Sequence, residues 1–297
     1  MINMYNLILD ELKKRIPLST DEDLALYLQS LQPCAKNLWT SYRSTIVNFN
    51  YALEENQVAY LLRYFPHYTL PVAYSFYENR NKGLMKICET SNQDIQLFGA
   101  GACPEIIGYL KFLAKCFPEK KYNLNIKAYD IATTTWKFGR DINYDAIIPH
   151  YLKSSTINSF NSEELDMTIP FQIDIDKQKS QIIIFQNCFN EIPVNRYRQV
   201  TENVKNLFIS LPPNSVLLLI DLANYSNAMN LLGNIKSEIS LQKGSLGTSS
   251  IIEKINRESS YYSNLPQIIK DNLLTREHGL IPKKSIDFSY VMFTKIK

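Results

Sequence analysis

The chain is poor in the residues that build metal centres and disulfide frameworks. Its 297 residues include only five cysteines and three histidines. The cysteines form no Cys-x-x-Cys pair, and no histidine stands at ligand spacing from any of them. We therefore expect no bound metal and no structural disulfide. Free thiols are typical of a reducing compartment, so the composition predicts a cytoplasmic protein.

Long hydrophobic runs are also absent. A membrane-spanning helix needs about 18 consecutive apolar residues, and no segment of this chain approaches that length. The first ten residues already include Asp10, which interrupts the apolar stretch that a signal peptide would have. We expect neither a membrane span nor a signal peptide.

Charge of one sign is lacking as well. The formal net charge is only +3, from 32 basic and 29 acidic residues. The basic residues are scattered, with short pairs such as Lys13-Lys14 and Lys120-Lys121. This pattern is typical of solvated faces, so nucleic acid is not an expected partner. The 45% hydrophobic content is enough for a sizeable core.

Residues 1–90 show helical patterns and no alternation of strands with helices. In the stretch 37–65, apolar and aromatic side chains such as Leu38, Tyr42, Ile46 and Phe49 recur at roughly helical intervals. We predict an all-helical N-terminal cap over this region.

From residue 91 onward, short apolar runs alternate with helical stretches, which is typical of an α/β domain with a mainly parallel, Rossmann-like sheet. We expect strands at 94–100, 124–130, 167–175, 181–187 and 214–223, and helices at 104–117, 133–153 and 195–209. The final run, 287–297, alternates like an antiparallel edge strand, and the Ser-rich stretch 234–264 resembles a surface insertion. The chain thus divides into a cap at 1–90 and an α/β domain at 91–297.

The stretch IQLFGAGACPEIIGYLKFL, residues 95–113, predicts a strand, a tight turn and a helix that begins at Pro104. Gly99 and Gly101 permit positive φ angles and close approach of a ligand, although they could equally serve a tight corner in the core. Pro104 replaces the third glycine of the dinucleotide fingerprint, and Glu105 places a negative charge there. A pyrophosphate is therefore disfavoured, whereas a cofactor with a cationic centre is tolerated.

Acidic and amide residues follow three further strands at the edge where open α/β sheets bind ligands. Asp130 at the end of the second strand could accept hydrogen bonds from ribose hydroxyls, or could cap the next helix. Asp174 or Asp176 is expected near an adenine edge, unless these acids merely end the third strand in solvent. The fourth strand is followed by three polar candidates, Asn187, Asn190 and Glu191.

Together these features resemble the class I S-adenosylmethionine-dependent methyltransferases over about residues 92–297. FGAGACPE (98–105) corresponds to the glycine motif, Asp130 to the ribose-binding acid, DID (174–176) to the adenine segment and FQNCFNEI (185–192) to the fourth-strand motif. The resemblance implies S-adenosyl-L-methionine as cofactor. The cofactor-binding residues that it implies are Gly99, Ala100, Gly101, Glu105, Asp130, Ile131, Asp174, Ile175 and Asn187.

The resemblance also implies where catalysis and acceptor binding occur. Asn190 and Glu191 are the candidate base or substrate anchor, unless they cap the helix that follows Pro193. Arg63, Tyr64 and His67 are the candidate acceptor residues, which could form the roof of the cofactor site or could simply pack between helices. A small molecule or a peptide is the expected acceptor.

Two departures from the family pattern keep a second hypothesis open. Leu97 stands where the motif usually has an acid, and Cys103 stands at its third glycine. An inactive, methyltransferase-like scaffold or partner-binding protein is the alternative. A nicotinamide-dependent oxidoreductase is disfavoured by Pro104 and Glu105, and RNA methylation by the lack of a basic segment interleaved with aromatics.

Overall fold

The computed structural model describes residues 3–44, 49–171, 181–241, 246–277 and 280–295. Within these ranges, six helices precede the first strand, as the periodicity predicts. They are α1 (Met4–Arg15), α2 (Asp21–Ser30), α3 (Gln32–Ser41), α4 (Glu54–Arg63), α5 (Phe65–Glu78) and α6 (Lys82–Cys88).

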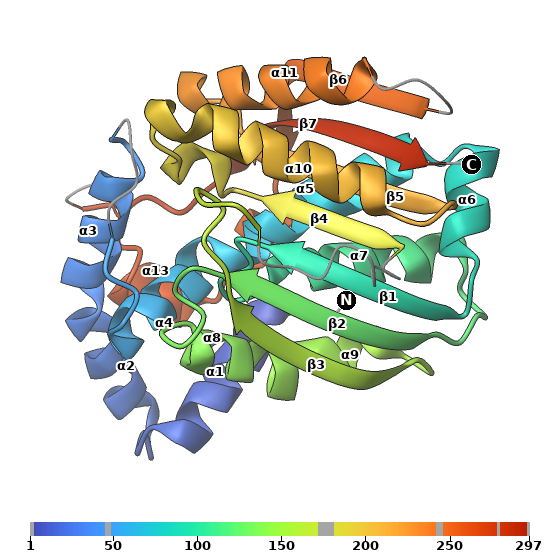
Figure 1. Cartoon of the computed structure of the whole chain (residues 1–297). Coiled ribbons are helices and arrows are strands. Elements are labelled where there is room, and N and C mark those ends of the chain that lie inside the picture. Colours follow the sequence, from blue (N-terminus) through green and yellow to red (C-terminus); the bar gives the residue numbers. More distant parts are fainter. Residues whose placement is uncertain (1–2, 45–48, 172–180, 242–245, 278–279, 296–297) are drawn as a thin grey trace.

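The rest of the chain builds one sheet of seven strands (Figure 1). The strands are β1 (Asn92–Phe98), β2 (Asn123–Asp130), β3 (Thr156–Glu164), β4 (Ile182–Gln186), β5 (Ser215–Leu222), β6 (Leu246–Glu258) and β7 (Ser285–Lys295). Their order across the sheet is β3-β2-β1-β4-β5-β7-β6. The first five strands run parallel, and β7 is antiparallel to both of its neighbours. The predicted α/β, Rossmann-like fold with an antiparallel last strand is confirmed.

Helices cover both faces of this sheet (Figure 1). α10 and α11 lie on one face, whereas α5, α7 and α9 lie on the other. None of the described helices is long and apolar enough to cross a membrane.

Within the described residues, the helices after β1 are α7 (Pro104–Cys116), α8 (Lys137–Ile142), η1 (Asn143–Ile147), α9 (Ile148–Leu152), η3 (Phe189–Glu191), η4 (Val194–Arg196), α10 (Tyr197–Ser210), α11 (Ser226–Ser240), α12 (Ser260–Ser263) and α13 (Gln267–Asn272).

The central strands of the sheet are apolar on both faces and are buried on both. Every residue of β4 (IIIFQ) and of β5 (SVLLLIDL) is buried. Strands of this composition need cover on both faces, which the two helical layers provide. The carboxyl ends of the parallel strands therefore meet at one rigid edge.

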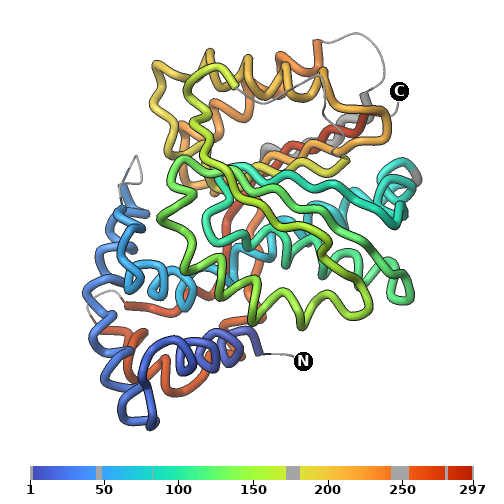
Figure 2. Tube along the Cα trace, turned by 60° about the horizontal axis from the view of Figure 1, so that its bottom comes forward, coloured from blue at the N-terminus to red at the C-terminus, as the bar shows by residue number. Residues whose placement is uncertain are grey.

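Three of the N-terminal helices lie at that edge, and a late segment of the chain joins them. α2, α3 and α4 sit beyond the carboxyl ends of β1, β2 and β4, and α13 lies among them (Figures 1 and 2). Asn272 of α13 accepts hydrogen bonds from Gln29 and Gln32, each at 2.8 Å. The cap that covers this edge thus combines residues from both ends of the sequence.

The predicted third strand is misplaced. β3 is Thr156–Glu164, whereas the expected segment, 167–175, is irregular as far as residue 171 and then leaves the described residues. β3 is an edge strand with mostly exposed or half-buried side chains, so its sequence, TINSFNSEE, is polar. Polar edge strands lack the apolar signal on which strand prediction depends.

The two last strands correct two further expectations. The Ser-rich stretch 234–264 is not an insertion, because it contains the end of α11 and the whole of β6 and α12. β7 is not an edge strand, because β6 pairs with it on the outside. The edge position of β6 explains why its sequence is polar, and the burial of residues 288–294 explains why most of β7 is apolar.

Candidate active site

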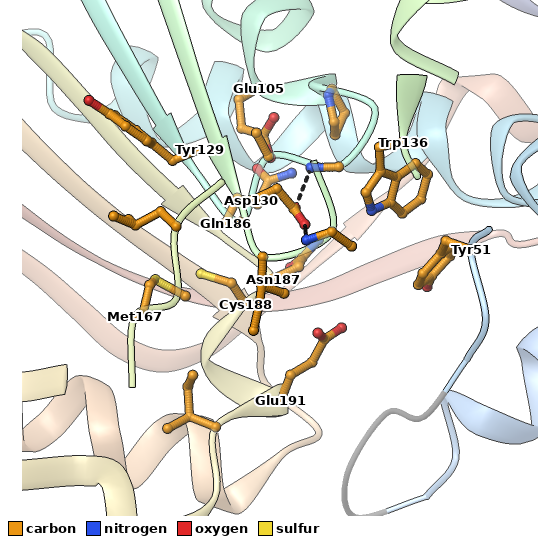
Figure 3. Close-up of a pocket in the computed structure, with 18 of the residues that line it drawn as sticks. Tyr51, Glu105, Tyr129, Asp130, Trp136, Met167, Gln186, Asn187, Cys188 and Glu191 are labelled. Atoms are coloured by element: carbon orange, nitrogen blue, oxygen red, sulfur yellow. Dashed lines mark hydrogen bonds between the residues drawn. The ribbon is translucent and has the colours of Figure 1, made fainter. Parts of the chain in front are cut away.

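A cavity of about 350 Å³ lies where the carboxyl ends of β1, β2 and β4 meet the helical cap (Figure 3). All seven cofactor residues predicted within the described ranges line it, although their role toward a cofactor stays a prediction. They are Gly99, Ala100, Gly101, Glu105, Asp130, Ile131 and Asn187. Asp174, Ile175 and Asp176 lie outside the described residues.

The turn after β1 needs its glycines for internal packing. Gly99 has φ +62°, and a Cβ there would lie 2.3 Å from the Cβ of Cys188 on the β4 loop. Gly101 has φ +48°, and a Cβ there would lie 3.2 Å from the Trp136 ring. Cys103 keeps a left-handed φ of 59° at the third glycine position of the motif. The turn therefore adopts the tight conformation of a glycine motif despite this substitution.

Asp130 connects the end of β2 to that turn. Its carboxylate accepts hydrogen bonds from the backbone N–H of Gly101 at 2.9 Å and of Ala132 at 2.8 Å (Figure 3). Burial raises the pKa of this carboxyl, although both N–H groups and Arg140 favour the ionised form. Each oxygen retains a further lone pair, so Asp130 can hold the turn and still accept hydrogen bonds from a ligand.

Three oxygen acceptors around the turn lack a hydrogen-bond partner among the described residues. They are Oε2 of Glu105 in the first turn of α7, Oε1 of Gln186 at the end of β4, and Oδ1 of Asn187, which has φ +55°. Burial raises the pKa of Glu105 well above its ordinary value. Unpaired buried acceptors are costly, so this wall suits a ligand that donates hydrogen bonds or carries positive charge.

Glu191 lies on the opposite side of the cavity, on η3 (Figure 3). Its side chain is reached by solvent, yet the surrounding walls raise its pKa to about 8, with Asp130 and Asp221 adding to the effect. Asp221, at the end of β5, is a residue that the sequence analysis missed. Its buried carboxylate accepts from the N–H of Phe189 at 2.9 Å and of Asn190 at 3.2 Å, which anchors η3 and so positions Glu191.

Asn190, the other predicted catalytic residue, does not line the cavity. It is 3% exposed, its N–H donates to Asp221 and its carbonyl accepts from the Nδ2 of Asn227 at 3.0 Å. Its described contacts hold η3 against β5 and α11.

The loop after β3 supplies a wall that the sequence analysis also missed. Leu165, Asp166, Met167 and Thr168 all line the cavity. The N–H of Leu165 donates to the carbonyl of Asp130 at 3.2 Å, which ties the loop to the end of β2. The misplaced third strand explains the omission, because the true β3 ends just before these residues.

Tyrosines of the cap and Trp136, which follows β2, form a wall of aromatic rings. Tyr51 stacks on Trp136 at 4.2 Å between ring centroids, and Tyr60 meets Trp136 edge-on at 5.1 Å. Tyr68 and Tyr42 complete this wall, and the Tyr42 hydroxyl lies 2.9 Å from that of Tyr51. We call these five residues the aromatic wall. The helical spacing of the tyrosines is the sequence pattern that could have pointed to this wall, but such spacing does not show which rings face a ligand.

The three predicted acceptor residues lie close to this wall but do not line the cavity. Tyr64 stacks on Tyr68 at 5.7 Å, and Arg63 lies over the Tyr64 ring at 5.5 Å. His67 is buried, with Nδ1 2.7 Å from the Ser259 hydroxyl and Nε2 3.3 Å from that of Tyr5. These contacts connect α5 to α1 and to the segment before α12.

His67 makes the stability of the fold depend on pH. Burial and the nearby Lys283 lower its pKa from 6.5 to about 3. Between these values the unfolded chain binds the proton more tightly, so the free energy of unfolding falls as the pH falls. We expect His67 to contribute a loss of about 2 kcal/mol between pH 7 and pH 5.

Urea denaturation of the wild type and of His67→Gln at both pH values measures this contribution. Glutamine keeps hydrogen-bonding groups but does not titrate. Between pH 7 and pH 5, the free energy of unfolding of the variant should therefore fall by about 2 kcal/mol less than that of the wild type. Equal losses in both proteins would show that His67 does not carry the pH dependence.

Strand order and direction define the class of fold. The order β3-β2-β1-β4-β5-β7-β6, with β7 alone reversed against β5, is that of the class I S-adenosylmethionine-dependent methyltransferases. The glycine turn after β1 and the acid that ends β2 occupy the positions that the sequence resemblance assigned to them.

Comparisons with known proteins give similarity only at the level of structure. No model of a protein family matches the chain, and no curated protein sequence matches it significantly. One similar solved structure is a TehB-like SAM-dependent methyltransferase from Corynebacterium glutamicum, with 11% identity, coverage of 76% of this chain and 88% of that one, and a TM-score of 0.37. The glycopeptide N-methyltransferase MtfA, solved with S-adenosyl-L-methionine, has 13% identity, coverage of 78% and 96%, and a TM-score of 0.38.

A third similar structure is an S-adenosylmethionine-dependent methyltransferase from Clostridium acetobutylicum. It shares 11% identity, covers 76% of this chain and 92% of its own, and has a TM-score of 0.37. At these scores, the assignment of the fold rests on the strand order and direction of the chain itself.

Proposed function

We propose that the protein is an S-adenosylmethionine-dependent methyltransferase whose cofactor lies at the ends of β1, β2 and β4. The observation that carries this proposal is the pair of unpaired acceptor oxygens on Glu105 and Asn187, beside a glycine turn held by Asp130. The methionine end of the cofactor carries an ammonium and a sulfonium, and both suit acceptors that have no donor on the protein. The same oxygens would repel a pyrophosphate, which argues against a nicotinamide cofactor.

Each part of the cofactor has candidate residues in this chain. The glycine turn and Glu105 would hold the amino-acid end, and Asp130 would accept from the ribose hydroxyls through its remaining lone pairs. Ile131 is 61% exposed although it lines the cavity, so a flat apolar ring such as adenine would cover it there. The bound cofactor supplies a methyl group activated by the positive sulfur.

The chain's own residues would then align the acceptor and exclude water, because methyl transfer from a sulfonium needs little more from a protein. The aromatic wall closes the cavity on the cap side, and Glu191 can hold a proton near neutral pH. The cap at 1–90 would enclose a small-molecule or peptide acceptor over the methyltransferase domain at 91–297. The five cysteines are all free, which agrees with a cytoplasmic location.

Calorimetric titration with S-adenosylmethionine, S-adenosylhomocysteine and NADH tests the cofactor. We expect the first two to bind the wild type and NADH not to bind. Asp130→Asn should weaken the binding of S-adenosylmethionine about 100-fold, because the amide removes a charged acceptor and directs an NH₂ group at a backbone N–H. Absence of binding to folded wild-type protein would favour the scaffold alternative.

Asp94→Asn is the matched control. Asp94 lies near the start of β1, at the opposite end of the strand from the cavity, and accepts from the Nδ2 of Asn125 at 2.8 Å. The affinity of the Asp94→Asn variant for S-adenosylmethionine should stay within about twofold of the wild type, since substitutions away from a site usually have small effects. Binding unchanged in Asp130→Asn would contradict the proposed ribose site.

A further inference from the structure

The carboxyl groups that line the cavity have no basic counterpart in its described walls. Among its described lining residues, four are acidic and none is basic. The acids come from separate elements: Glu105 from α7, Asp130 from β2, Asp166 from the loop after β3 and Glu191 from η3. A concave site with low-dielectric walls concentrates the field of those carboxyls that are ionised, and a bound cation would favour their ionised forms, so the site favours cations over anions.

The proposed cofactor accounts for only part of this arrangement. Glu105, Asp130 and Asn187 surround the glycine turn, where its amino-acid and ribose groups would lie. In Figure 3, Glu191 and Tyr51 lie away from Glu105, and the other tyrosines of the aromatic wall come from the cap. The part of the cavity around Glu191 and Tyr51 would remain for the acceptor.

Gln186, at the end of β4, supplies an independent sign of what the cavity holds. Its Nε2 donates to the carbonyl of Tyr68 in α5 at 2.9 Å, which fixes the orientation of the amide. The opposite atom, Oε1, is therefore an acceptor, and it has no partner among the described residues although Gln186 is 1% exposed. A ligand that donates a hydrogen bond beside Tyr68 would satisfy it.

The aromatic wall and Glu191 favour a positive charge on the ligand that donates this hydrogen bond. The faces of tyrosine and tryptophan rings attract ammonium groups, and the attraction strengthens when water is excluded. Figure 3 shows Tyr51 and Trp136 side by side, with the Glu191 carboxylate directed into the space below Asp130. Rings, carboxylate and amide oxygen thus line one cavity, and each of them suits the same kind of ligand.

From this arrangement we infer that the methyl acceptor is a cationic amine, held by Glu191, Gln186 and the aromatic wall; the inference rests on the proposed function. Acceptors with phosphate or carboxylate groups near the reacting atom are disfavoured, because none of the described lining residues is basic. For transfer, the positive charge of the ammonium would favour the ionised form of Glu191, which would take one proton from it. A bound cofactor would supply the methyl group to the freed nitrogen lone pair and would be left as a neutral thioether, so the products would be a methylated amine and that thioether. The proton then leaves Glu191 for solvent, which reaches its side chain.

Three probes of one shape and different charge test this inference. 2-Phenylethylammonium, 2-phenylethanol and phenylacetate are titrated into the wild type saturated with S-adenosylhomocysteine. We expect the ammonium to bind at least about tenfold more tightly than the alcohol, and phenylacetate to bind most weakly. Glu191→Gln should remove most of that preference. Glu164→Gln, an exposed carboxylate on β3 outside the cavity, is the control and should keep it.

The outcomes separate the two proposals. If S-adenosylhomocysteine does not bind the folded wild type, the proposed function fails and this inference fails with it. If it binds normally but the ammonium has no advantage over the alcohol, only the inference is overturned. The inference is likewise overturned if the preference survives in a folded Glu191→Gln variant, with folding checked by thermal unfolding.

Discussion

Replacement of Gly99 by valine should abolish measurable binding of S-adenosylmethionine, with a loss of affinity of at least about 100-fold. A Cβ at this position would lie 2.3 Å from the Cβ of Cys188, and φ is +62°, a conformation that β-branched residues avoid. The glycine turn and the β4 loop cannot both keep their positions. Since the proposed cofactor site lies between them, its geometry is lost even where the rest of the fold survives.

Calorimetry of the variant measures this loss, and circular dichroism reports whether the fold remains. Gly99→Ala combined with Cys188→Gly is the informative companion, because it removes the colliding side chain and leaves only the strain of the positive φ. We expect it to recover a large part of the lost affinity. Wild-type affinity in Gly99→Val would contradict the placement of the cofactor against this turn.

The second large effect concerns folding, and it arises where α7 crosses α5. A Cβ at Gly108 would lie 2.5 Å from the carbonyl oxygen of Thr69 and 2.9 Å from the Cβ of Val72. Both helices would have to separate under the sheet. We expect Gly108→Ala to lower the free energy of unfolding by about 2 kcal/mol, although alanine is the better helix former.

Gly233 in α11 provides the matched control, because a Cβ there would meet nothing within 4 Å. Gly233→Ala should therefore raise the free energy of unfolding by up to about 1 kcal/mol. Urea denaturation of both variants measures the contrast. A stabilised Gly108→Ala variant would mean that the two helices can move apart at little cost.

The sequence predicts the elements that are apolar and buried. β1, β2, β4 and β5 are all found close to their predicted positions, as is the helix that begins at Pro104. β3 and β6 were not recognised, because both are edge strands with polar sequences. The antiparallel direction of β7 was predicted, but its inner position depends on a partner that the pattern did not reveal.

The strand-end residues of the site follow from the same patterns. Gly99, Asp130 and Asn187 could be chosen from the sequence because each stands directly after an apolar run, and such ends converge at one edge of a parallel sheet. Arg63 and His67 could not be judged in this way. Their helix lies near the cavity, but its rotation about its own axis depends on contacts with α1 and the segment around Ser259.

The amino-acid sequence by itself thus determines the sheet edge, the glycine turn and the acid that holds it, because these depend on local backbone geometry and on runs of apolar residues. Only the tertiary structure decides what faces that edge. Tyr51, Trp136 and Glu191 lie far apart along the chain, and no local pattern relates them. Long-range packing of the cap against the sheet, together with the anchor that Asp221 provides for η3, brings them into one cavity.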